Sequence, residues 1–167
     1  MTSARPLRVG VSELLAHPGT RRRFDDEVTL DGLAISSAAV VPGSPIEIHL
    51  VLESIGGPVT ASGTVGASWT GECRRCLEPV QGHASASVRE IFETRPTEGE
   101  TYRLDGEQID LEPMVRDAVL LALPLAPLCA PDCEGPAPEA FPTGPPDEDA
   151  PALDPRWAAL RDLDLGN

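Results

Sequence analysis

The chain has 167 residues, about the length of one domain, and 41% of them are hydrophobic, which is enough for a buried core. Its 27 acidic and 13 basic residues give a formal net charge of −14, which argues against a general nucleic-acid coat because phosphate repels such a surface. All the basic residues are arginine, so chemistry that needs a lysine is excluded. No stretch reaches the roughly 18 apolar residues of a membrane span. We expect an acidic cytoplasmic protein.

The first two thirds of the chain are predicted to be mainly β-strands. A short helix is indicated at Ser12–Ala16, and one or two strands are indicated between Val28 and Val41. Ile46–Leu52 begins with strict alternation of apolar and polar residues, which is typical of a half-buried strand. Val59–Glu72 and Gln81–Thr94 are two further predicted strands. Successive strands joined by short turns favour an antiparallel sheet.

Two helices are predicted after the strands. Asp110 is placed to cap a helix over Leu111–Ala122, which Pro124 stops. A second helix is predicted at the C-terminus, with Asp154 as its cap and Pro155 at its first position. We therefore expect an α+β fold, in which a strongly curved or barrel-like antiparallel sheet carries a long helix and a short C-terminal helix. The predicted buried face of the long helix has helical spacing: Met114, Val115, Ala118, Leu121 and Ala122.

The chain is predicted to hold one folded domain and a tail. Residues 1–133 form the single α+β domain. Residues 134–153 contain no basic residue and are rich in proline and acidic residues, a composition typical of a disordered linker. Residues 154–167 are predicted to form an amphipathic C-terminal helix or tail.

Four cysteines in a reducing compartment indicate metal or redox chemistry before structural disulfides. Cys73 and Cys76 form a C-x-x-C pair, and Cys129 and Cys133 form a C-x-x-x-C pair. Each pair has the spacing of one half of a four-cysteine zinc site, and thiolates are soft ligands that suit Zn²⁺. A zinc ion shared by the two pairs would tie the end of the long helix to the sheet. Free thiols, a disulfide or a redox dithiol remain open.

A thiol redox protein that uses Cys73 and Cys76 is one alternative. Arg74 and Arg75 would lower the pKa of a neighbouring thiol and favour the thiolate. A thioredoxin-like C-x-x-C opens a helix within a βαβ unit. Here the pair is followed by Leu77-Glu78-Pro79, a turn into another strand. The context therefore disfavours redox catalysis.

Arginines and one tryptophan are candidate contacts with RNA or with a partner protein. Guanidinium groups can pair with phosphate, and the alternative for Arg21–Arg23 and for Arg74 and Arg75 is solvent exposure with local acidic partners. Trp157 has two interpretations: it docks on the protein's own domain, or it anchors a partner. The full set of candidates is Arg21, Arg22, Arg23, Arg74, Arg75, Arg116, Arg156 and Trp157.

The segment Cys73-Arg74-Arg75-Cys76-Leu77-Glu78-Pro79 resembles the YceD family of bacterial large ribosomal RNA subunit accumulation proteins. The family pattern has two more cysteines after Cys133, at positions where this chain has Ala137 and Ala140. The resemblance therefore implies that Cys73 and Cys76 complete the site or that this chain has lost its metal. Three further segments agree in order: Val40–Gly43, Ile109–Leu125 and Leu153–Leu160.

The resemblance implies a non-enzymatic role in large-subunit ribosomal RNA accumulation and ribosome assembly. The residues agree with it, because no catalytic constellation is present and an acidic chain suits a basic ribosomal protein. We expect a cytoplasmic factor that binds a basic ribosomal protein, large-subunit precursor RNA or both, with zinc as its cofactor. The alternatives are a zinc-binding adaptor with a partner outside the ribosome and the thiol redox protein.

Overall fold

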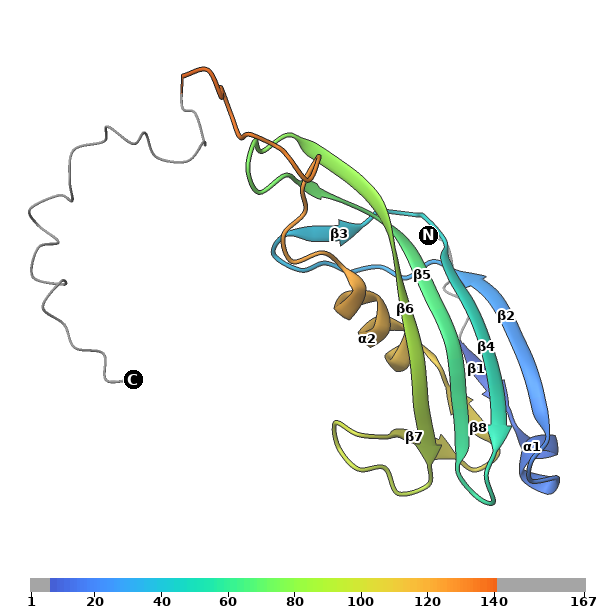
Figure 1. The fold of residues 1–167 in the computed structure, drawn as a ribbon. Helices are drawn as coiled ribbons and strands as arrows, with labels where there is room; N and C mark the ends of the chain where they lie inside the picture. The colour runs from blue at the N-terminus through green and yellow to red at the C-terminus, as the bar shows by residue number, and fades with distance from the viewer. Residues whose placement is uncertain (1–6, 141–167) are drawn as a thin grey trace, which may run out of the picture. The chain divides into compact units, whose positions relative to one another are not determined.

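A computed structural model describes residues 7–140, in which eight strands form a curled mixed sheet, a half-barrel, with two short helices (Figure 1). The contacts within the chain separate two units, Met1–Cys133 and Glu134–Asn167. The elements of the first unit are, in chain order, β1 (Arg8–Gly10), α1 (Ser12–Ala16), β2 (Arg21–Val28), β3 (Ala38–Val40), β4 (Ile46–Ser54), β5 (Val59–Glu72), β6 (Pro79–Glu93), β7 (Tyr102–Asp105), β8 (Gln108–Asp110) and α2 (Glu112–Ala122).

The centre of the sheet is the antiparallel meander of β4, β5 and β6, and the strand order is β1-β8-β7-β6-β5-β4-β2 with β3 paired to β5. In β4 the alternation of the sequence directs Ile46, Ile48, Leu50 and Leu52 into the core. The predicted strands at Ile46–Leu52, Val59–Glu72 and Gln81–Thr94 are therefore confirmed, as is the helix at Ser12–Ala16.

The curl of the sheet brings the backbones of β4 and β5 close together at Gly63. A Cβ atom at Gly63 would collide with the carbonyl oxygen of His49 on the paired strand. The φ of Gly63 is +154°, which side-chain-bearing residues rarely adopt. Glycine at this position permits the local bend of a strongly curved sheet.

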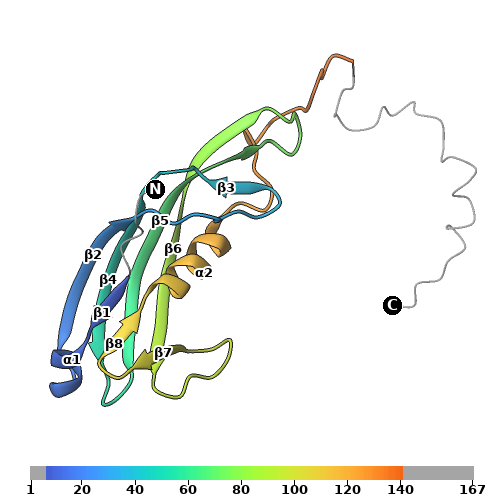
Figure 2. The ribbon, with the colours of Figure 1, turned by 180° about the vertical axis from the view of Figure 1, so that it is seen from behind.

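Helix α2 lies inside the curve of the sheet and packs against β5 and β6 (Figure 2). Four of its residues, Met114, Val115, Ala118 and Val119, are buried. The prediction of a long helix is wrong, because α2 has 11 residues. Leu123 is extended, with φ −62° and ψ 139°, since a residue before proline is disfavoured in helical conformation.

The start of α2 lies one residue beyond the predicted start. Asp110 belongs to β8, and its Oδ1 accepts the backbone N–H of Glu112 at 3.0 Å, so this side chain still satisfies one of the first free N–H groups of the helix. The predicted burial of Leu121 is wrong, since 86% of this residue is exposed. Leu121 belongs to the last turn of α2, where no other described residue covers it.

The sheet is not purely antiparallel, which corrects the predicted fold class. β6 and β7 run parallel and pair through Phe92 with Tyr102 and through Glu93 with Arg103. The loop 94–101 returns the chain so that β7 follows the direction of β6 (Figure 1). A pairing of two residues per strand is too short to leave a periodic signal in the sequence.

The charged stretch Arg21–Glu27, whose arginines are candidate contacts with solvent exposure as the alternative, lies in the edge strand β2, which pairs with β4. Every second residue of β2 is exposed to solvent. The stretch is therefore a β-strand whose charged side chains are partly solvated. The predicted linker 134–153 lies mostly outside the described residues and the predicted helix 154–167 lies entirely outside them, so both stay predictions.

Candidate metal centre

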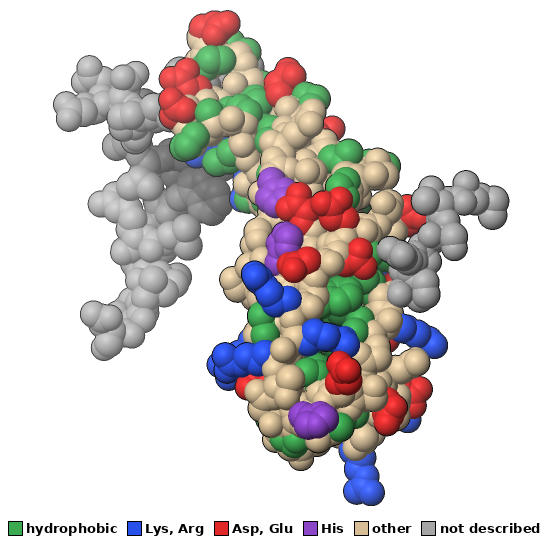
Figure 3. All heavy atoms as spheres, turned by 90° about the vertical axis from the view of Figure 1, so that its right-hand side faces the viewer, with side chains coloured by type: hydrophobic (Ala, Val, Ile, Leu, Met, Phe, Trp, Pro, Cys, Tyr) green, Lys and Arg blue, Asp and Glu red, His purple; other side chains and the backbone are tan. Residues whose placement is uncertain are grey.

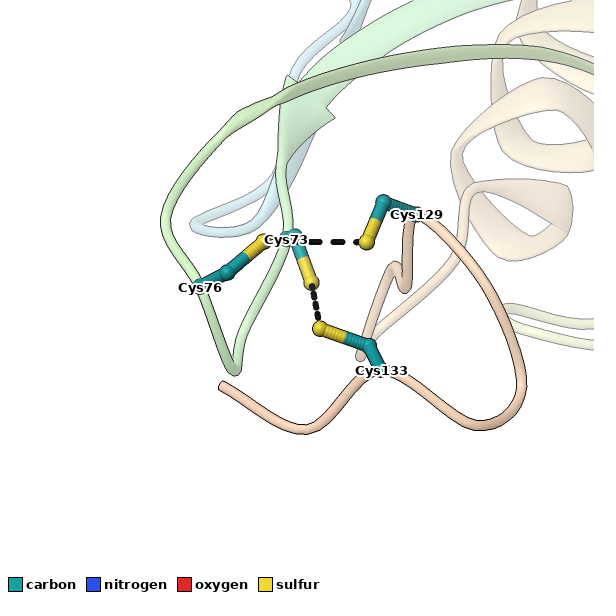
Figure 4. A group of neighbouring side chains, drawn as sticks. All are labelled: Cys73, Cys76, Cys129 and Cys133. Atoms are coloured by element: carbon teal, nitrogen blue, oxygen red, sulfur yellow. Dashed lines mark hydrogen bonds between the residues drawn. The ribbon is translucent and has the colours of Figure 1, made fainter. Parts of the chain in front are cut away.

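The two cysteine pairs meet at one end of the sheet. Cys73 follows β5 and Cys76 lies in the turn into β6, whereas Cys129 and Cys133 lie in the segment after α2. The four sulfur atoms all lie within 4.8 Å of one another and point toward a common centre (Figure 4). The four cysteines could therefore hold a metal ion. The pairs complete each other without Ala137 and Ala140.

The separations between sulfurs fit a tetrahedral thiolate site. The Sγ atoms of Cys73 and Cys133 are 3.8 Å apart, and those of Cys76 and Cys129 are 3.6 Å apart. A tetrahedral zinc ion with Zn–S bonds of about 2.3 Å places its sulfurs about 3.8 Å apart. Both short contacts join one pair to the other, whereas a redox dithiol would join Cys73 to Cys76. All four cysteines are free thiols.

The turn that carries the first pair is held by backbone hydrogen bonds. The N–H of Cys73 donates to the carbonyl of Glu78 at 2.8 Å, and the N–H of Leu77 donates to the carbonyl of Cys73 at 2.9 Å. Leu77 adopts φ +64°, the left-handed conformation that costs a residue with a Cβ about 1–2 kcal/mol. Its side chain is 66% exposed, so burial does not offset this strain. The turn thus keeps its shape at the expense of local strain.

The second pair is fixed to the first by the arginines between Cys73 and Cys76. The backbone N–H of Arg74 donates to the carbonyl of Pro127 at 2.9 Å. The Nη1 of Arg75 donates to the carbonyl of Cys133 at 2.6 Å. The Oγ of Ser37, just before β3, donates to the carbonyl of Pro124, just after α2, at 2.9 Å. This bond holds the segment after the helix close to β3. These hydrogen bonds hold the two cysteine segments beside each other.

The electrostatics of the cluster favour one thiolate in the absence of a cation. The pKa of Cys73 is lowered to about 6, first because backbone N–H groups of Cys76 and Cys129 donate to its sulfur. The pKa of Cys129 is raised to about 12, because its hydrogen bonds to the sulfurs of Cys133 and Cys76 hold the proton. Four thiolates this close would repel one another, and a divalent cation would offset that repulsion.

Cys73 is fully buried, Cys76 and Cys133 are partly buried, and Cys129 is exposed. The centre thus lies at the surface with one ligand in the core. Four protein sulfurs leave no open coordination position for a substrate, which is the arrangement of structural rather than catalytic zinc sites.

The predicted arginine contacts have different surroundings. Arg21 pairs with Glu53 at 3.0 Å, and Arg116 binds Glu112 at 2.8 Å and the carbonyl of Asp31 at 2.9 Å. Within residues 7–140, the guanidinium groups of Arg22, Arg23 and Arg74 contact no hydrogen-bond or ion-pair partner, and Arg75 contacts only the carbonyls of Pro131 and Cys133. Arg156 and Trp157 lie outside the described residues.

On the outward face of the sheet, the strand register aligns Arg23, one of the predicted contacts, with Arg89, which sequence reasoning missed. The register places Arg23, Val51, Ser62 and Arg89 side by side across β2, β4, β5 and β6. Figure 3 shows arginine side chains gathered on this face, with acidic and histidine side chains beside them. Only the register of four strands brings Arg23 and Arg89 together, so no local signal could have indicated Arg89.

The acidic and histidine patch on the same face contains two cross-strand pairs. The Nδ1 of His49 lies 2.9 Å from the Oδ1 of Asp25, and the Nε2 of His83 lies 4.0 Å from the Oε2 of Glu47. Each histidine thus lies beside a carboxylate of another strand at the surface. His49 is thus a surface residue of β4 in this fold.

The fold and the cysteine cluster define a half-barrel β protein with a surface centre of four cysteines that could hold a metal ion. No helix among residues 7–140 is long and apolar enough to cross a membrane. The chain belongs to the YceD family: residues 61–164 match the family described as Large ribosomal RNA subunit accumulation protein YceD. The name of the family implies a role in the accumulation of large-subunit ribosomal RNA.

Mycobacterial proteins are similar over nearly the whole chain. Uncharacterized proteins of Mycobacterium bovis and Mycobacterium tuberculosis are each 34% identical over 173 residues, which cover 96% of this chain and 82% of theirs. An uncharacterized protein of Mycobacterium leprae is 32% identical, with 95% of this chain and 77% of its own length covered. No solved structure matches the chain.

Proposed function

We propose that this protein is a non-enzymatic cytoplasmic factor that supports accumulation of large-subunit ribosomal RNA and assembly of the large subunit. It acts by binding a basic ribosomal protein, large-subunit precursor RNA or both. The observation that carries the proposal is membership of the YceD family over residues 61–164, which include the first cysteine pair and α2. The formal charge of −14 supports a partner rich in lysine and arginine, because opposite charges steer and accelerate the encounter.

We propose further that the four cysteines bind one zinc ion with a structural role. The support is geometric: sulfur separations of 3.6 and 3.8 Å match the edges of a zinc tetrahedron, and no ligand position is left for a substrate. The ion would fasten the segment after α2 to the turn between β5 and β6. The surface that binds the partner would then keep a fixed position relative to α2.

Depletion of the protein tests the assembly role. We expect the ratio of large-subunit to small-subunit ribosomal RNA to fall in depleted cells and to recover when the wild-type gene is restored. The double variant Cys76→Ser with Cys129→Ser should restore the ratio poorly, because it removes the metal centre. The matched control Thr64→Ser with Ser68→Ala, on exposed positions of β5, should restore it fully. An unchanged RNA ratio after complete depletion would contradict the proposal.

Two alternatives make different predictions. A zinc-binding adaptor with a partner outside the ribosome would keep the metal but leave the RNA ratio unchanged. A thiol redox protein would need an accessible nucleophile, and Cys73 is fully buried. Reductase-coupled turnover that depends on Cys73 and Cys76 would support the redox alternative.

A further inference from the structure

The two long edges of the sheet differ in their chemistry. Among residues 7–140, β2 pairs only with β4, and charged residues lie on both of its faces, including Arg22 and Asp26 on the inner side. Charged and inward-pointing residues are how proteins protect an edge strand from pairing with another chain. The edge at β2 is therefore protected.

β6 has a second edge without that protection. Within residues 7–140, its second side is paired only at Phe92 and Glu93, where β7 lies beside it, and the stretch from Pro79 to Ile91 has no strand there. Alternate residues of such a stretch direct N–H and C=O groups away from β5. From Gly82 to Val88 the residues are almost all small, which leaves the backbone accessible.

The open edge of β6 borders a groove against α2. This groove has a volume of about 360 Å³, and its lining includes residues of both elements. On the helix side, Leu121 follows Met114 by two turns and so lies on the same face, yet 86% of Leu121 is exposed. Leu125, just after the helix, is 85% exposed. An apolar side chain on the core-facing side of α2 is thus left without a partner.

The charged side chains of the groove are all acidic. Among its lining residues the charged ones are Glu90 of β6 and Asp117 of α2. Tyr102 also lines the groove and donates its hydroxyl to the Oδ2 of Asp117 at 2.8 Å. The pKa of Tyr102 is raised well above its ordinary value, first by burial and then by the hydrogen bond with Asp117 and the negative charges of Asp117 and Glu90. Negative potential and apolar surface therefore occur together.

We propose that an extended, basic segment of a partner protein pairs with the free edge of β6 as an added strand and fills this groove. Its inward side chains would be apolar beside Leu121 and basic beside Glu90 and Asp117, and its backbone would pair with β6 between Ser85 and Glu90. This mode of recognition takes affinity from main-chain hydrogen bonds and specificity from alternate side chains. The inference rests on the proposed function, in which the partner is a basic ribosomal protein.

Charge selects this occupant over the other candidates. The stretch 134–153 of the same chain has no basic residue, and residues 154–167 hold two arginines against three aspartates, so neither stretch complements Glu90 and Asp117 in net charge. A second copy of the chain would bring the same acidic groups and a formal charge of −14. An RNA strand would bring phosphates to two carboxylates. A lysine- or arginine-containing strand has the complementary charge.

A peptide of seven residues, Thr-Arg-Thr-Val-Thr-Arg-Thr with blocked ends, is the probe, and fluorescence anisotropy with the full chain is the measurement. In one derivative the backbone nitrogens of all the threonines are methylated, and in the other those of the arginines and the valine are methylated. Each derivative therefore lacks the N–H donors along one edge of the extended peptide. Pairing with β6 predicts that one derivative keeps its affinity and the other loses about tenfold or more. Equal affinities of the two derivatives would overturn the proposal, because charge attraction alone does not distinguish them.

Variants locate the bound peptide. Glu90→Gln with Asp117→Asn should weaken binding about three- to tenfold, because two complementary charges are lost. The control Asp25→Asn with Glu27→Gln changes the net charge equally on the β2 edge and should change the affinity by less than about twofold. Equal losses in the two double variants, displacement of the peptide by a single-stranded RNA, or a stable dimer that excludes the peptide would each overturn the proposal.

Failure of this inference is distinguishable from failure of the proposed function. If the peptide derivatives bind equally while depletion still lowers large-subunit RNA, the groove is not the binding site and the function stands. If depletion has no effect while one derivative alone binds, the groove binds a basic strand from another kind of partner.

Discussion

The sulfur atom of Cys76 lies 3.6 Å from that of Cys129, although 53 positions separate the two residues in the sequence. The same arrangement holds for Cys73 and Cys133, at 3.8 Å. Each contact joins the turn after β5 to the segment after α2. A bound metal ion would therefore stabilise a tertiary contact of the fold, and its removal is the first test.

Removal of the metal should destabilise the chain. We expect the purified protein to contain one zinc ion per chain and its melting temperature to fall by roughly 5 °C or more after treatment with a chelator. The variant Cys73→Ser should contain little zinc and should show no further loss with the chelator. A protein without metal whose melting temperature is unaffected by chelator and by added zinc would contradict the structural role.

Leu77→Gly should stabilise the turn that carries Cys73 and Cys76. Glycine adopts φ +64° without strain, and the exposed leucine side chain contributes little burial. We expect the free energy of unfolding of the metal-bound protein to rise by about 0.5–1 kcal/mol, the relief of strain exceeding the added entropy of the unfolded chain. Leu77→Ala is the control, since it removes the same side chain but keeps the strained Cβ. Equal stabilities of the two variants would show that the conformation of Leu77 carries no strain.

The prediction for Gly63 tests the curl of the sheet. Gly63→Ala should lower the free energy of unfolding by at least about 2 kcal/mol, because the new Cβ would collide with the carbonyl of His49. Gly10→Ala in β1 is the matched control, since a Cβ there meets no atom within 4 Å. Chemical denaturation of both variants gives the comparison. A cost at Gly63 no larger than at Gly10 would mean that β4 and β5 are further apart than described.

Tyr102 is the single tyrosine of the chain, so tyrosinate absorbance reports its ionisation alone. Burial and the carboxylates of Asp117 and Glu90 raise its pKa above the ordinary value of about 10. We therefore expect tyrosinate to form only well above pH 10 in the folded protein and near pH 10 after unfolding. Asp117→Asn should bring the folded pKa down, and titration of the folded protein near pH 10 would contradict the described contact.

The same pKa shift fixes the sign of a stability change at alkaline pH. Above pH 10 the unfolded chain loses the Tyr102 proton while the folded chain keeps it, so the unfolded state binds fewer protons and stability falls as pH rises. Below pH 10 both states keep the proton, so the contribution of Tyr102 to the free energy of unfolding is fully present there. Tyr102→Phe removes it and keeps the ring stacked on Phe92, at a centroid distance of 5.4 Å. The wild type should lose stability above pH 10 more steeply than this variant.

Arg74 and Arg75 are adjacent but should respond differently to substitution. Arg75 donates to the carbonyl of Cys133, so Arg75→Gln should loosen the second cysteine pair and lower zinc affinity. The guanidinium group of Arg74 has no hydrogen-bond or ion-pair partner among residues 7–140, so Arg74→Gln should leave zinc binding unchanged and weaken association with large-subunit precursor RNA. Unchanged RNA association in the double variant Arg74→Glu with Arg75→Glu would rule out a contact with RNA at this turn.

The central strands were predictable because their physical cause is local. In a pleated strand with one buried face, residues alternate between core and solvent, as over Ile46–Leu52. The small residues and the β-branched residues of Val59–Glu72 likewise favour a strand. The spacing of the cysteines indicated two half-sites, but the meeting of Cys76 with Cys129 depends on α2 returning the chain to the sheet. Sequence patterns could not show this contact, because it forms between segments far apart in the chain.

Other features follow from tertiary contacts and left no local signal. The parallel pairing of Phe92 with Tyr102 spans two residues, and the row that joins Arg23 to Arg89 exists only through the register of four strands. Helical spacing placed Leu121 on the buried face, yet the sheet does not reach it. Periodicity indicates which side of a helix is apolar, and the surrounding elements decide how much of that side is covered.

Binding to large-subunit precursors is measured by sedimentation of a cell lysate through a sucrose gradient, at low and at moderate salt. We expect the tagged protein to migrate with the precursors at low salt and to leave them as the salt concentration rises, because an acidic factor and a basic partner attract each other through charges that salt screens. Migration at the top of the gradient at both salt concentrations would contradict stable binding to large-subunit precursors.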